Sequence, residues 1–138
     1  MPRTGSGGTA HERMSRDDYR ELAPIVHVAY QSRITKDQLR TLAVTLPHAV
    51  SLAVECPEKP YDDNLRPGDV IIRFQHCSPH DSADLDLLID VRSKWFATRA
   101  EDRHQRCERL RDAVLDAVGH LSIGVYLSLP IAGWAQTD

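Results

Sequence analysis

The segment LPHAVSLAV (46–54) has the same pattern as LRDAVLDAV (110–118): both read L-x-x-A-V-x-x-A-V and start 64 residues apart. The apolar residues recur every three to four positions, which is the spacing of one helix face. A capping box precedes each segment, Thr-x-x-Gln at 35–38 and Thr-x-x-Glu at 98–101, and predicts where each helix begins. Caps and helix faces keep nearly the same offset. This indicates one small unit present twice, the alternative being a coincidence of residues common on helix faces.

Two further residues bear on the predicted helices. Pro47 lies inside the first pattern, where its missing amide proton is expected to kink the helix or divide it in two. Gly119 follows the second pattern and predicts its end.

Apolar stretches flank both helix patterns and favour strands. They are PIVHVAY (24–30), DVIIRFQ (69–75), LDLLIDVRSKWF (85–96) and LSIGVYLSL (121–129). The predicted fold is α+β (α/β): two tandem βαβ units, repeat one at 24–75 and repeat two at 85–130, form a four-stranded sheet with two helices on one face. Each unit should have parallel strands and a right-handed crossover. The other sheet face is expected to be apolar and covered by other subunits.

Length and composition limit the classes of function. The 138 residues suit one compact domain, predicted at 24–138, after a Gly- and Ser-rich stretch that predicts a flexible N-terminal extension at 1–23. A net charge of −3 gives no electrostatic case for a nucleic acid or an anionic membrane as partner. No apolar run approaches the roughly 20 residues that span a bilayer.

The three cysteines, Cys56, Cys77 and Cys107, are far apart and form no C-x-x-C pair. A disulfide framework or a structural zinc site is therefore not expected, and reduced cysteines place the protein in the cytoplasm. The polar stretch HCSPHDSAD (76–84) lacks a known metal-ligand spacing and is interpreted as a loop, so no metal is expected.

Polar residues in the predicted strands mark a candidate pocket. Arg33, Arg73, Arg92 and Arg99 lie at or near strand ends and helix starts, and two of them could form an anion site. His27 lies in the first strand, and Asp90 is its counterpart 63 residues later. We expect the two to face each other as a polar pair, with His27 hydrogen-bonded rather than catalytic.

The segments PIVHVAYQSRITKDQL (24–39), DVIIRF (69–74) and DLLIDVRSKWFATRAEDR (86–103) resemble the tautomerase superfamily. That group includes 4-oxalocrotonate tautomerase, 5-carboxymethyl-2-hydroxymuconate isomerase, macrophage migration inhibitory factor and malonate semialdehyde decarboxylase. The resemblance extends from Pro24 to Asp138 and depends more on the doubled architecture than on any single motif. It implies a homotrimer with no metal or organic cofactor.

The resemblance also implies an activity. It suggests an isomerase or lyase acting on a small keto or unsaturated carboxylic acid. Pro24 matches the N-terminal proline whose amine is the catalytic base in that family. Arg33 matches an arginine before the first helix, and Arg73 lies near one in the second strand. With Arg92 they are the predicted substrate-binding residues, because a guanidinium group pairs well with a carboxylate.

One departure from the family pattern leaves the activity open. Pro24 follows Ala23, so its nitrogen is an amide and cannot be a base near neutral pH. Either the preceding residues are removed in the cell, or the protein is a catalytically silent binding or structural member of the fold. A third alternative is a dimeric ferredoxin-like module, in which the strands would pair antiparallel.

Overall fold

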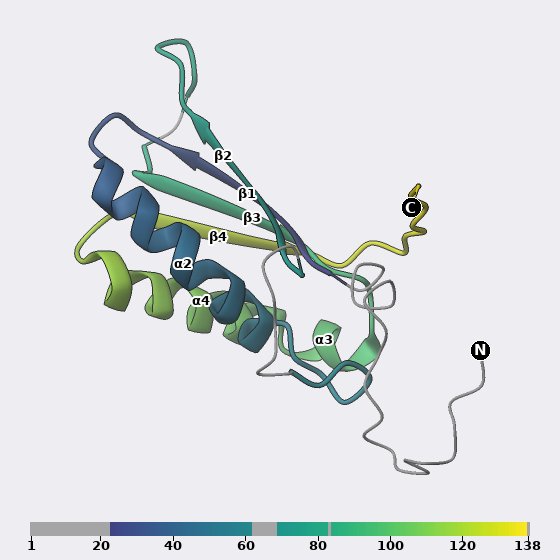
Figure 1. Ribbon diagram of the computed structural model, residues 1–138. Coiled ribbons are helices and arrows are strands. Elements are labelled where there is room, and N and C mark those ends of the chain that lie inside the picture. The colour runs from purple at the N-terminus through teal and green to yellow at the C-terminus, as the bar shows by residue number, and fades with distance from the viewer. Residues whose placement is uncertain (1–22, 62–68, 83, 138) are drawn as a thin grey trace.

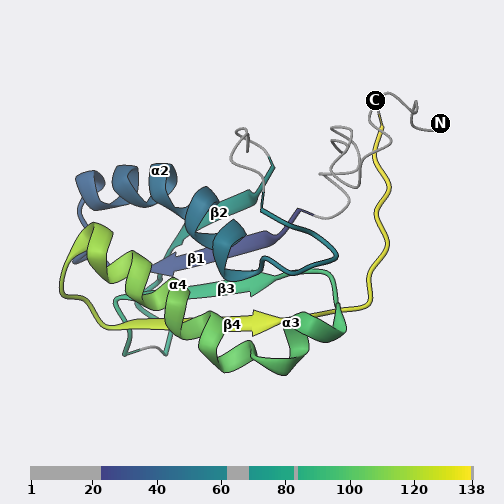
Figure 2. The same ribbon diagram turned by 90° about the horizontal axis from the view of Figure 1, so that it is seen from below.

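Four strands form one mixed sheet that two helices cover on one face (Figures 1 and 2). The computed structural model describes residues 23–61, 69–82 and 84–137, so the expected extension before Ala23 lies outside the described residues. The sheet has the order β2-β1-β3-β4. The strands are β1 (Ile25–Tyr30), β2 (Ile71–His76), β3 (Leu87–Arg92) and β4 (Ile123–Ser128).

The helices are α2 (Lys36–Ala53), the short α3 (Ala97–Glu101) and α4 (Arg103–Val118). β1 pairs with β2 in parallel, and so does β3 with β4, while β1 and β3 pair antiparallel at the centre. The two tandem βαβ units are therefore confirmed. The parallel pairing inside each unit excludes the ferredoxin-like alternative. Within the described residues, no helix is long and apolar enough to cross a membrane.

The repeated helix pattern supplies equivalent core residues. Leu46 and Val50 of α2 are buried, and so are their counterparts Leu110 and Val114 of α4. Alternate residues of the two central strands meet these helices: Val26, Val28, Leu87, Ile89 and Val91. Because side chains alternate across a strand, every second residue of the sheet is left for the opposite face.

The capping box of the first helix forms as predicted. The Gln38 amide donates to Thr35 Oγ1 at 3.0 Å, and the Thr35 amide donates to Gln38 Oε1 at 2.8 Å. Pro47 does not divide α2, which continues from Lys36 to Ala53. A proline leaves the carbonyl four residues earlier without its helical partner. That residue is Ala43, which is exposed, so water can replace the lost hydrogen bond.

The second capping box was a wrong prediction. Thr98 lies inside α3, whose N-cap is Phe96, and its hydroxyl donates to Glu58 Oε1 at 2.7 Å. A break at Asp102 separates α3 from α4, because this residue has extended φ (−129°). The predicted end is correct: α4 stops before Gly119, whose φ of +87° suits a residue without Cβ.

These two threonines give a matched test of the caps. Thr35→Ala should lower the free energy of unfolding by about 1 kcal/mol, because two amides of α2 lose their partners. Thr98→Ala should cost clearly less, since its hydroxyl caps no helix. Urea unfolding followed by circular dichroism measures both, and an equal or larger loss for Thr98→Ala would contradict the assignment.

Candidate functional site

The sheet face opposite the helices has a polar centre. Strand register places Arg73, His27, Asp90 and Tyr126 side by side across all four strands. The expectation of an apolar face is therefore wrong. The reason is the alternation along each strand: the apolar residues face the helices, and the charged residues between them face away.

This polar row borders a hollow of about 340 Å³. Its lining residues are Ile25, Val26, His27, Arg73, Asp90 and Arg92. Two of the three predicted binding arginines, Arg73 and Arg92, thus come together although they lie on different strands. In the part of the chain that the structure describes, neither side chain has a hydrogen bond or ion pair within the protein. Both guanidinium groups are available to an anion.

His27 and Asp90 differ in their partners. They are Cα partners in the β1–β3 pairing, which confirms that they lie opposite each other. However, His27 Nε2 hydrogen-bonds to Gln75 Oε1 at 2.8 Å. Asp90 Oδ1 is buried and has no hydrogen-bond partner. Buried carboxylate oxygens normally accept at least one hydrogen bond, so this atom is an exception at the edge of the hollow.

Pro24 lies beside the hollow, but its ring faces the other way. It precedes Ile25 and is buried, with the same side-chain parity as the core residue Val26. Its carbonyl accepts a hydrogen bond from the Ile71 amide at 3.0 Å. Its nitrogen is bonded to the carbonyl carbon of Ala23 and has no basic lone pair.

Arg33 lies at the other end of β1, about 20 Å away along a six-residue strand. Its Nε donates to Asp86 Oδ1 at 2.5 Å. The Ser122 amide donates to the same carboxylate at 3.0 Å. This amide first, and Arg33 after it, lower the pKa of Asp86. Within one chain, Arg33 therefore does not join Arg73 and Arg92.

The polar loop after β2 forms local contacts. His76 Nε2 hydrogen-bonds to Ser32 Oγ at 3.1 Å, and the Ser78 amide donates to Asp81 at 2.8 Å. Among the described residues, no group of three His, Cys, Asp or Glu side chains could hold a metal ion.

Two buried arginines were missed as structural residues. Arg99 is fully buried; its Nε donates to the Val54 carbonyl at 2.7 Å and its Nη1 to the Lys94 carbonyl at 2.6 Å. Arg106 Nη1 donates to the Ala53 and Glu55 carbonyls at 3.1 and 2.6 Å. Both therefore satisfy carbonyls at the end of α2, and Arg99 does not serve the hollow. The signal was present: Arg106 lies four residues before Leu110, on the core-facing stripe of α4.

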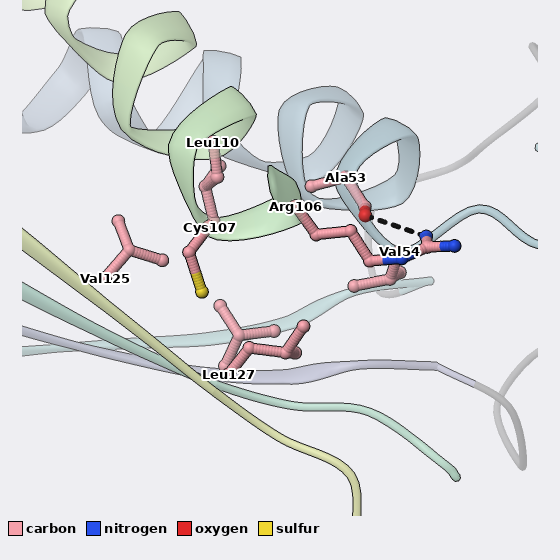
Figure 3. A pocket seen from close by; sticks show the side chains of 8 residues that line it. Ala53, Val54, Arg106, Cys107, Leu110, Val125 and Leu127 are labelled. Carbon is pink, nitrogen blue, oxygen red and sulfur yellow. Dashed lines mark hydrogen bonds between the residues drawn. The ribbon is translucent and has the colours of Figure 1, made fainter. Parts of the chain in front are cut away.

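A small cavity beside Arg106 belongs to this packing (Figure 3). Its volume is about 10 Å³, close to the minimum for one water molecule. Figure 3 shows Arg106 reaching the Ala53 carbonyl past Cys107 and Leu110, with Val125 and Leu127 below. The cavity is too small for a substrate. Burial raises the pKa of the Cys107 thiol, which favours an unreactive cysteine.

Lys59 lies in the field of the same arginines. It exchanges backbone hydrogen bonds with Cys56, whose side chain is buried. Burial of the ammonium group, and then the charge of Arg99, lower the pKa of Lys59 from 10.5 to about 8. The folded protein therefore releases this proton at a lower pH than the unfolded chain does.

This difference predicts a pH dependence of stability. Between pH 8 and 10.5 the unfolded chain binds more protons at Lys59 than the folded protein, so this residue makes the free energy of unfolding rise with pH. Lys59→Met should remove that rise, and Lys36→Met, at an exposed position, should keep it. Urea unfolding across this range measures the slope; identical slopes in wild type and Lys59→Met would contradict the prediction.

No protein-family model matches the chain. No curated protein sequence matches it either.

Three solved structures share its fold. Malonate semialdehyde decarboxylase has a TM-score of 0.60 at 15% identity, covering 83% of this chain and 91% of that one. A fused 4-OT wild type symmetric trimer has a TM-score of 0.56 at 18% identity, covering 77% and 85%. A 5-carboxymethyl-2-hydroxymuconate isomerase from Deinococcus radiodurans has a TM-score of 0.53 at 13% identity, covering 87% and 93%. The resemblance to the tautomerase superfamily is confirmed at the level of the fold.

Proposed function

We propose that the protein binds a small keto or unsaturated carboxylic acid in the hollow on its open sheet face, as a tautomerase-like isomerase. The observation that carries the proposal is the presence of Arg73 and Arg92 in one hollow of about 340 Å³. The solved structures with this fold include an isomerase and a decarboxylase named for carboxylic acids, which supports this class of ligand.

The two arginines suit a carboxylate. Each guanidinium group offers a planar pair of donors that matches the two oxygens of the ligand. Because neither arginine is occupied by a described protein acid, no internal ion pair must break before the ligand binds. The volume is at the lower end of the range for small-molecule sites, which favours a compact acid.

A second candidate is a binding protein without catalytic activity. It is favoured by the acylated nitrogen and buried ring of Pro24, which exclude the proline as base while Ala23 is attached. Catalysis by Pro24 would require a chain that begins at this residue. Both candidates predict the same carboxylate binding at Arg73 and Arg92, and they differ only in turnover.

Binding by the two arginines is directly testable with phenylpyruvate as the probe. Arg73→Gln and Arg92→Gln should each weaken its binding about 10-fold or more, because each loses charge-assisted hydrogen bonds worth roughly 1.5–3 kcal/mol. Isothermal titration calorimetry measures the dissociation constants. Arg40→Gln, an exposed arginine on α2, should bind like wild type. Unchanged binding in both hollow variants would remove the proposed site.

We also propose that the protein is a homotrimer. Ile25, Leu88 and Tyr126 lie on the open sheet face and are 41, 39 and 63% exposed, and burial of such apolar area stabilises association. The fused 4-OT with this fold is a symmetric trimer, which supports the same assembly here.

The assembly predicts a native mass three times the 15.5 kDa of one chain. Native mass spectrometry at micromolar concentration measures it, because the expected species differ by whole multiples. Tyr126→Asp should shift the distribution toward the single chain by placing a charge in the buried contact. A wild-type protein that stays monomeric would contradict the assembly.

A further inference from the structure

The starting point is an acid in the hollow with an unused oxygen. Asp90 is on β3, one of the two central strands. Its Oδ1 is buried without a hydrogen-bond partner, although the residue is only partly buried and lines the hollow. A polar atom in this state lacks a donor that the folded protein does not supply among its described residues. A ligand proton would supply it.

The neighbours of Asp90 leave it free to act as a base. The closest polar residue across the strand pair is His27, and its Nε2 is already bonded to Gln75. No described ion pair joins Asp90 to Arg73 or Arg92, although all three line the same hollow. The carboxylate is thus placed among cations without being neutralised by one of them.

The spacing also fits a short acid. Arg92 follows Asp90 by two residues on the same strand face, about 7 Å along β3. Arg73 lies two strands away in the same row, about 10 Å across the sheet. A ligand carboxylate bound at either arginine would leave the next carbons of a 2-oxo acid near Asp90, with one polar contact at each end.

From this arrangement we propose that Asp90 is the catalytic base of the hollow, taking a proton from the carbon next to the carbonyl of a bound 2-oxo acid. The inference rests on the proposed function, because it needs the acid to bind at Arg73 and Arg92. It supplies the base that the acylated Pro24 nitrogen cannot provide.

The proposed step is balanced without any other reactant. Asp90 takes the proton from C3, and the C3–H electron pair forms the C2=C3 double bond. The carbonyl π pair moves to oxygen and gives the enolate. Protonated Asp90 then returns the proton to the enolate oxygen to give the enol, or to carbon to give the keto form. The positive charges of Arg73 and Arg92 stabilise the carboxylate and the developing enolate.

Two measurements on the full chain test this inference, with phenylpyruvate in D₂O as the probe. Calorimetry measures binding, and proton NMR measures loss of the C3 protons by exchange with deuterium above the rate without protein. Wild type should bind and accelerate exchange. Asp90→Asn should bind equally well or more tightly, because it removes a negative charge beside the ligand, while its exchange rate falls roughly 100-fold or more.

Controls separate a catalytic role from a structural one. Asp112→Asn changes an exposed acid on α4 and should exchange like wild type. Asp90→Glu keeps the carboxylate but displaces it, and should retain more exchange than Asp90→Asn. Circular dichroism and thermal unfolding confirm that the variants fold; if Asp90→Asn does not fold, reduced exchange in folded Asp90→Glu with unchanged binding supports the role.

The outcomes distinguish the two proposals. No saturable binding by wild type would overturn the proposed function and this inference with it. Binding without accelerated exchange, or exchange that is unchanged in Asp90→Asn, would overturn the role of Asp90 while leaving the carboxylate site intact. Loss of exchange together with unchanged binding in Asp90→Asn supports it.

Discussion

The structure depends on one apolar layer, between the sheet and the two long helices. Val26, Val28, Ile89 and Val91 of the central strands are buried under α2 and α4. Their burial fixes which residues of each strand face the helices, because a shift by one residue would turn every side chain to the opposite face. The charged residues at the alternate positions must then face away. The apolar layer therefore determines where the hollow lies.

Much of the fold could be predicted because it repeats local rules. Thr35 begins a helix because its box is preceded by an extended residue and followed by an apolar stripe. The same four-residue pattern at Thr98 fails because the chain is already helical from Ala97. A cap pattern states what a threonine can do, and the residues before it decide whether a helix begins there.

The site was less predictable than the fold, since it depends on strand register. Arg73 and Arg92 were singled out from their places near strand ends, but only the order β2-β1-β3 brings them to one hollow. Arg33 was expected beside them and instead pairs with Asp86. Arg99 was considered for the same anion site and instead satisfies carbonyls beneath the sheet. Sequence spacing does not distinguish a ligand-binding arginine from one that binds backbone carbonyls.

The same alternation limits where a base can be found. Pro24 has the parity of Val26, so its ring faces the helices, and its nitrogen is held in a peptide bond. A base for a ligand at Arg73 and Arg92 must come from the other parity, on the open face. Of the acids and histidines that line the hollow, His27 is already bonded to Gln75, and Asp90 has an oxygen without a donor. The packing that buries Pro24 thus also brings Asp90 to the ligand side of the sheet.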